Sequence, residues 1–110
     1  MLPFSDVYPA YVNKVERKGR SVSELNEVIR WLTGFSEKKL QELLKSQSSL
    51  MDFFGAARIN PNAALITGSV CGVKIQEIED PLMLKIRYLD KLVDELAKGR
   101  PMEKILRSGN

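Results

Sequence analysis

Apolar residues recur every three or four positions along most of this chain, which is the spacing of one face of an α-helix. The longest such series contains Leu82, Ile86, Leu89, Val93 and Leu96. Asp80 precedes this series as a helix N-cap, and Pro81 suits the first helical position. Gly99 follows the series as a residue that ends helices. The pattern therefore predicts a helix over residues 81–98.

The polar side of this predicted helix carries opposite charges four residues apart. Lys91 with Glu95, and Asp94 with Lys98, form two such pairs that we expect on the solvent side. Asp90 and Asp94 also share one face, as carboxylates do in some helical metal sites. Because lysines surround them and the chain has no histidine, we expect a solvated charged face rather than a metal site.

Residues 5–18 show the same helical spacing near the N-terminus. A proline inside a helix removes one hydrogen bond and clashes with the preceding turn, so it is best tolerated in the first turn. The position of Pro9 therefore predicts a helix that begins near Asp6 or Val7. Gly19 is expected to end it.

Further helices are predicted from their capping residues. Ser21 and Glu24 form the pattern of a capping box, and Gly34 suits the end of the helix that follows. Additional helix starts are predicted at Ser36, Ser49, Asn60–Pro61 and Pro101.

The stretch "VCGVKI", residues 70–75, fits a helix poorly. It is rich in β-branched residues and contains Gly72, so it could be a short strand, an extended connection or a helical turn. A single short strand has no partner elsewhere in the sequence, so we expect an irregular joint.

Taken together, the elements predict an all-α fold. The 110 residues suit one domain that spans residues 1–110, and 44% apolar residues suffice for one core. We expect a compact bundle of roughly five to seven short helices packed around the helix near residues 81–98.

Composition excludes several kinds of chemistry. The chain has no histidine and one cysteine, which removes the Ser–His and Cys–His pairs of many hydrolases and a structural zinc site. No apolar run approaches the roughly 20 residues that cross a bilayer, and no signal-peptide pattern is present. We therefore expect a cytoplasmic protein. The net charge of +3 is too small to indicate a polyanionic partner.

Four stretches, "VYPAYVNKVERKGR", "WLTGF", "ITGSVCGVKIQEIEDPLM" and "IRYLDKLVDELAKGRPMEKIL", resemble a bacterial family known as domain of unknown function 2200. The resemblance covers nearly the whole chain. It implies a compact, mainly helical, cytoplasmic bacterial protein. The family has no assigned activity, so the resemblance transfers no functional residues.

Two features near the centre of the chain are candidate sites. Cys71 is a candidate reactive thiol, because Lys74 three residues later would favour its thiolate on a helix. A small buried residue at a crowded joint is the expectation that we favour. Glu77, Glu79 and Asp80 are candidate cation ligands, but all three suit the start of the following helix, and we expect that structural role.

The stretch "EVIRWLTGFSEKKLQELL" has the layout of a helix–turn–helix unit, with Gly34 in the turn. The candidate nucleic-acid contacts are Lys38, Lys39, Lys45, Arg17 and Lys18. Arg30 falls where crossing helices need a small residue, and Glu37 and Glu42 would face the phosphates. A plain helical corner is therefore favoured.

The favoured function is a non-catalytic binding or interaction module with an unknown protein partner or a second copy of the chain. The first alternative is a helix–turn–helix nucleic-acid binder. The second is a carboxylate-dependent enzyme, for which the sequence supplies no nucleophile–base pair, phosphate loop or metal motif. We expect no cofactor, no metal and no membrane association.

Overall fold

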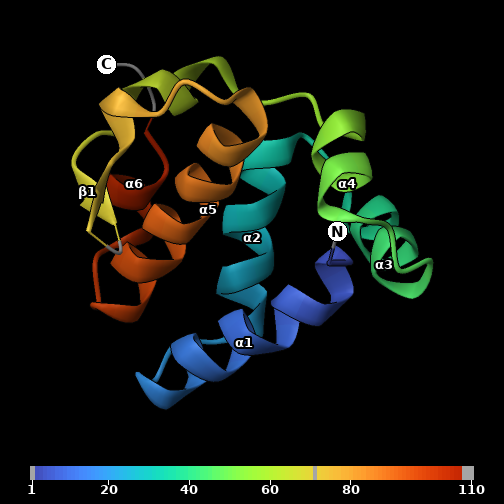
Figure 1. Cartoon of the computed structure of the whole chain (residues 1–110). Coiled ribbons are helices and arrows are strands. Elements are labelled where there is room, and N and C mark those ends of the chain that lie inside the picture. The colour runs from blue at the N-terminus through green and yellow to red at the C-terminus, as the bar shows by residue number, and fades with distance from the viewer. Residues whose placement is uncertain (1, 71, 108–110) are drawn as a thin grey trace.

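The structure, a computed structural model, describes residues 2–70 and 72–107 of the chain (Figure 1). Its elements are α1 (Phe4–Arg17), α2 (Val22–Thr33), α3 (Glu37–Lys45), α4 (Leu50–Ala56), η1 (Pro61–Leu65), β1 (Ser69–Val70), β2 (Val73–Lys74), η2 (Ile75–Glu77), α5 (Pro81–Ala97) and α6 (Met102–Ile105). The prediction of a compact all-α bundle around the helix near residues 81–98 is confirmed. Among the described residues, no helix combines the length and the apolarity needed to cross a membrane.

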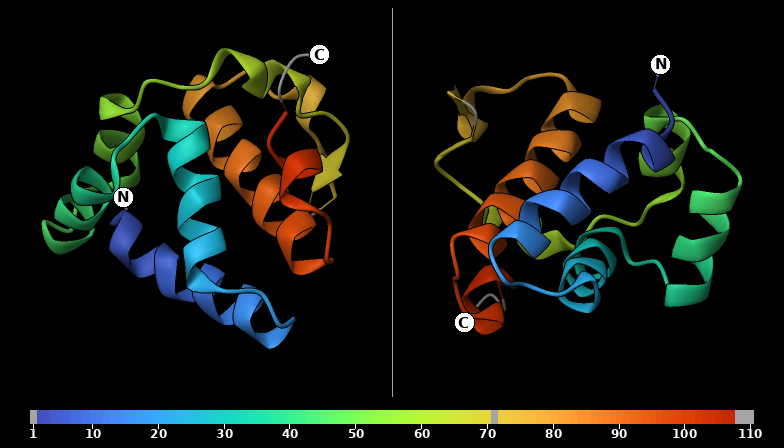
Figure 2. Two further views of the ribbon diagram at one scale, coloured as in Figure 1. Left: turned by 180° about the vertical axis from the view of Figure 1, so that it is seen from behind. Right: turned by 90° about the horizontal axis from the view of Figure 1, so that it is seen from below.

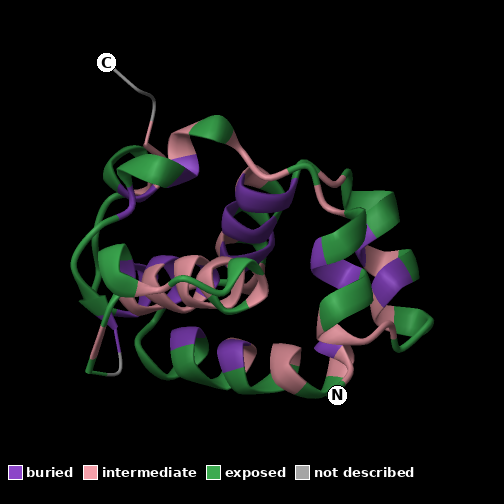
Figure 3. Cartoon of the chain, turned by 45° about the horizontal axis from the view of Figure 1, so that its top comes forward, coloured by how far each residue is buried: buried purple, intermediate pink, exposed green. Residues whose placement is uncertain are grey.

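Helices α2 and α5 form the centre of the core. Each contacts the other and α1, and α5 also packs against α4, α6 and strand β1. The buried apolar residues of the two helices are Leu25, Val28, Ile29, Leu32, Leu89, Leu92, Val93, Leu96 and Ala97. Figure 3 shows these buried faces turned toward the interior of the bundle. Burial of one such side chain contributes roughly 1.5–3 kcal/mol to the stability of the fold. Each of the other α-helices contacts α2 or α5, so this pair positions them.

Helix α1 begins earlier than its proline predicts. It starts at Phe4, so Pro9 lies inside the helix and the expected start near Asp6 or Val7 is wrong. Contacts with a distant segment explain the earlier start. The Phe4 ring stacks on Phe53 at a centroid distance of 3.8 Å, and the Phe4 amide donates to the Ser48 carbonyl at 2.8 Å. These contacts offset the hydrogen bond that a proline removes from a helix.

The predicted helix caps are confirmed. Ser21 and Glu24 form a complete capping box, and Ser36 and Ser49 each accept a hydrogen bond from the amide three residues later. Gly34 ends α2 with a φ of 76°, a conformation that side chains disfavour. The predicted cap at Asn60 and the start at Pro61 are also observed, although the short helix there is of the 3₁₀ type.

The irregular joint predicted for residues 70–75 is instead a small hairpin. Strands β1 and β2 pair antiparallel, with Ser69 opposite Lys74 and Val70 opposite Val73. Gly72, with a φ of 79°, lies in the connection between them. The segment therefore pairs with itself, because a tight glycine turn lets two adjacent pieces of chain form a ladder. Buried Val70 anchors the hairpin against α5.

Candidate functional site

The lysines of the helix–turn–helix layout lie on the exposed side of α3. Lys38, Lys39 and Lys45 are all exposed. Glu37 and Glu42 are exposed on the same helix, so α3 presents both signs of charge to solvent. A helix with this mixture repels as well as attracts a line of phosphates.

A chain of polar contacts fixes α3 against α1 and α2. The Tyr8 hydroxyl donates to Asn26 Oδ1 at 2.6 Å, and Asn26 Nδ2 donates to Glu37 Oε1 at 3.3 Å. Burial raises the pKa of Tyr8 despite the hydrogen bond to Asn26, and the charge of Glu37 raises it further. Arg30 is exposed, 3.9 Å from Glu37, and so does not lie inside the helix crossing. The corner between α2 and α3 is thus held by a structural network.

The second basic cluster, Arg17 and Lys18, does not join the lysines of α3. Both residues are exposed at the C-terminal end of α1. That end of α1 and helix α3 lie on opposite sides of the molecule in Figure 1 and in both views of Figure 2. The fold therefore separates the five candidate nucleic-acid contacts into two groups.

The described candidates near the hairpin, Glu77, Glu79 and Asp80, do not form a metal site. Asp80 Oδ1 accepts from the Leu82 amide at 3.0 Å, which confirms the predicted N-cap. Glu77 and Glu79 are exposed. Cys71, the candidate thiol, lies outside the described residues. Within those residues, no group of three or more Cys, Asp or Glu side chains is placed to hold a metal ion.

Asp90 and Asp94 face α1, so the expectation of a solvated face is wrong. Helices α1 and α5 lie side by side and run in the same direction (Figure 1). The Tyr11 hydroxyl donates to Asp90 at 2.5 Å, and Lys14 Nζ lies 3.4 Å from Asp94. Lys98 Nζ lies 3.0 Å from Asp94, as the sequence predicted. Desolvation acts to raise the pKa of Asp94, but the two ammonium groups outweigh it and lower the pKa.

Glu95 is buried, and the predicted solvent-side pair with Lys91 is therefore wrong. Its side chain is only 7% exposed. Arg107 donates to its two oxygens at 2.6 and 2.8 Å, and Arg100 donates to Oε2 at 2.9 Å. Lys91 Nζ instead donates to the Ser69 carbonyl at 3.1 Å. A buried carboxylate needs such partners, and this one ties the segment after α6 to α5.

Arg20 makes polar contacts at the end of the bundle where α5 ends. Its Nη1 donates to the carbonyls of Leu96 and Arg100 at 3.2 and 2.9 Å, which satisfies backbone oxygens at the end of α5. Its Nη2 lies 2.8 Å from Glu24 Oε2. The hydrogen bond from Arg20, aided by the Ser21 amide, lowers the pKa of Glu24 to about 2.

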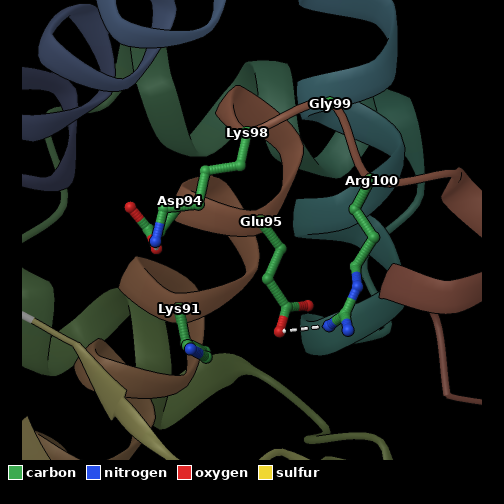
Figure 4. Close-up of a pocket in the computed structure, with 6 residues that line it drawn as sticks. All are labelled: Lys91, Asp94, Glu95, Lys98, Gly99 and Arg100. Atoms are coloured by element: carbon green, nitrogen blue, oxygen red, sulfur yellow. Dashed lines mark hydrogen bonds and ion pairs between the residues drawn. The ribbon is translucent and has the colours of Figure 1, made fainter.

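Between these ion pairs lies a cleft of about 370 Å³. It is lined by Lys91, Asp94, Glu95, Lys98, Gly99 and Arg100 (Figure 4). Figure 4 shows Lys91 and Glu95 projecting from neighbouring turns of α5, while Lys98 reaches back to Asp94. The lining thus combines three cations with two carboxylates, and both carboxylates already have partners.

Comparison with known proteins supports the fold but supplies no activity. The crystal structure of "uncharacterized protein SP1917" superposes with a TM-score of 0.90 at 44% sequence identity, over 96% of this chain and 87% of that one. No curated protein matches the sequence. The family model described as "Uncharacterized protein conserved in bacteria (DUF2200)" matches residues 1–107. The chain therefore belongs to this bacterial family of uncharacterised proteins, as its sequence motifs indicated.

Proposed function

We propose that the protein is a non-catalytic binding module and that the cleft beside the C-terminal half of α5 is its ligand site. The ammonium group of Lys91 carries this proposal. Its contact is the backbone carbonyl of Ser69, and it has no ion-pair partner in the part of the chain that the structure describes. A cation that lines a cleft without a neutralising carboxylate favours a ligand carboxylate or phosphate.

The two carboxylates of the cleft support binding rather than acid–base catalysis. Both oxygens of Glu95 accept hydrogen bonds from guanidinium groups, and each oxygen of Asp94 lies near a lysine. A general base needs an oxygen that is directed at the substrate proton. A ligand anion on Lys91 would leave all of these pairs in place.

Titration with small anions tests this proposal. Sodium phosphate and sodium acetate are added at constant ionic strength while the backbone amide chemical shifts of residues 91–100 are recorded by NMR. We expect saturable shifts in the wild-type protein and none in Lys91→Met, which keeps the aliphatic stem and removes the charge. Lys85→Met is the matched control, because Lys85 lies on the same helix but does not line the cleft.

The control should titrate like the wild-type protein. If neither anion gives saturable shifts in the wild type, or if Lys91→Met titrates unchanged, the proposed site is wrong.

A further inference from the structure

The parallel packing of α1 and α5 brings their C-terminal ends together. Along the two helices, Tyr11 contacts Asp90, and one turn later Lys14 contacts Asp94. The next turn holds Lys18, the C-cap residue of α1, and Lys98, the C-cap residue of α5. Contacts of Arg20 with the carbonyls of Leu96 and Arg100 hold the two ends in place.

This end of the molecule is basic. At the end of α1, Lys14, Arg17 and the C-cap residue Lys18 are spaced three and four residues apart and so share one face, whereas Glu16 lies on the opposite side of the helix. Lys98 adds a fourth cation at this end of the molecule, and Lys14 and Lys98 both pair with one carboxylate, Asp94. We call these four cations, Lys14, Arg17, Lys18 and Lys98, the basic end. Their excess of three charges over Asp94 equals the net charge of the whole chain, +3.

The cations of the basic end are available to a partner. Lys98 is 73% exposed although it pairs with Asp94, and Arg17 and Lys18 have no ion pair within the described residues. Basic side chains near helix C-termini often serve the last carbonyl groups of the helix. At the end of α5, however, the guanidinium group of Arg20 already fills that role.

We propose that the basic end and the cleft together bind an acidic peptide segment of a protein partner. The inference rests on the proposed function, because Lys98 belongs to both surfaces. Lys91 and Lys98 are seven residues apart in the sequence, which corresponds to a distance of about 10 Å along the helix axis. A peptide in the polyproline II conformation advances about 3.1 Å per residue with three residues per turn, so carboxylates three residues apart share one face and match the spacing of the two lysines.

The position of Asp94 favours a peptide over a nucleic acid. It lies between Lys14 and Lys98, so a continuous line of phosphates would pass over a negative charge. A peptide places its carboxylates at separate positions. It also carries backbone N–H groups that can donate hydrogen bonds to an aspartate. The mixed charges of this surface thus fit a segment with spaced acidic residues.

The test uses a peptide with glutamate at every third position, and a version with glutamine at those positions as the uncharged control. Affinity is measured by fluorescence anisotropy for the wild type and for two double variants. Arg17→Gln with Lys18→Gln removes two charges from the basic end. Lys38→Gln with Lys39→Gln removes the same charge from exposed sites on α3 and is the matched control.

We expect the wild type to bind the glutamate peptide and not the glutamine peptide. The Arg17/Lys18 variant should bind about fivefold or more weakly, as the loss of two exposed charge pairs implies, and the Lys38/Lys39 variant should bind within about twofold of wild type. Equal weakening in both variants, or no peptide binding, overturns the inference. Tight duplex DNA binding that depends on Arg17 and Lys18 also overturns it.

Phosphate binding separates this inference from the proposed function. The Arg17/Lys18 variant should keep the wild-type phosphate titration, because the Lys91 site is intact. A protein that binds phosphate through Lys91 but not the peptide would contradict only the inference about the basic end. A wild-type protein that shows no saturable shifts with either phosphate or acetate contradicts the proposed function itself.

Discussion

At the scale of single residues, Glu95 helps to hold the C-terminal part of the chain in place. Its carboxylate is buried and accepts hydrogen bonds from Arg107 and Arg100. Asn62 Nδ2 also donates to the Arg107 carbonyl at 3.0 Å, so the same segment is fixed from two sides. Removal of one partner from a buried ion pair is costly because the other charge stays partly buried.

We predict that Glu95→Ala lowers the free energy of unfolding by about 3 kcal/mol, because it leaves the largely buried Arg107 guanidinium without its carboxylate. Urea denaturation followed by circular dichroism measures this change. Glu103→Ala, at an exposed position on α6, is the control and should change stability by less than about 0.5 kcal/mol. A Glu95→Ala variant as stable as the control would contradict a structural role for this carboxylate.

The Arg20–Glu24 pair predicts a pH dependence. The pKa of Glu24 falls from 4.5 to about 2 on folding, so the pair stabilises the fold above pH 4.5 and loses its effect as the pH falls toward 2. Because the Glu24 side chain is 34% exposed, solvent screening limits its contribution to about 1 kcal/mol or less. Glu24→Gln should therefore be less stable than wild type at pH 7.

At about pH 2 the two proteins should have nearly equal stability, because Glu24 is then protonated in the unfolded chain and about half protonated in the folded protein. Thermal unfolding at both pH values checks this. A stability difference that stays constant between pH 7 and pH 2 would show that the charge of Glu24 does not contribute.

At the scale of elements, local capping signals predicted helices well and non-local contacts decided the exceptions. Ser21, Ser36 and Asp80 each cap a helix as the sequence indicated, because a cap needs only its own backbone neighbours. The start of α1 depends on the stacking of Phe4 on Phe53, which sequence spacing does not reveal. The hairpin was missed because its strands are too short to give an alternating pattern.

Helix α5 provides the stability prediction at this scale. Leu89 lies in the middle of its buried stripe and is 1% exposed. We predict that Leu89→Ala lowers the free energy of unfolding by about 2–5 kcal/mol, because the substitution leaves a cavity in the core. Chemical denaturation measures the loss, with the exposed Met83→Ala on the same helix as the control. A loss below about 0.5 kcal/mol would mean that the stripe is not packed.

At the scale of the whole molecule, the candidate cleft could not be located from the sequence. Its lining comes from α5 and the turn that follows it, and its key cation contacts the hairpin through the Ser69 carbonyl. The burial of Glu95 had one visible signal, its position beside Leu96 and three residues after Leu92 in the apolar series. Its partner Arg107 is twelve residues away, in the segment after α6, so only the fold reveals the pairing.

The distribution of charge over the whole molecule leads to the last prediction. The basic residues suggested for nucleic-acid binding form two groups on opposite sides of the fold, and α3 carries exposed glutamates beside its lysines. We predict no duplex DNA binding tighter than the roughly 10⁻⁴–10⁻⁶ M of non-specific contacts at physiological salt. A salt-titrated assay on random duplex compares the wild type with the Lys38→Ala, Lys39→Ala double variant. Submicromolar affinity that falls in the variant, with a smaller salt dependence, would show instead that α3 contacts phosphates.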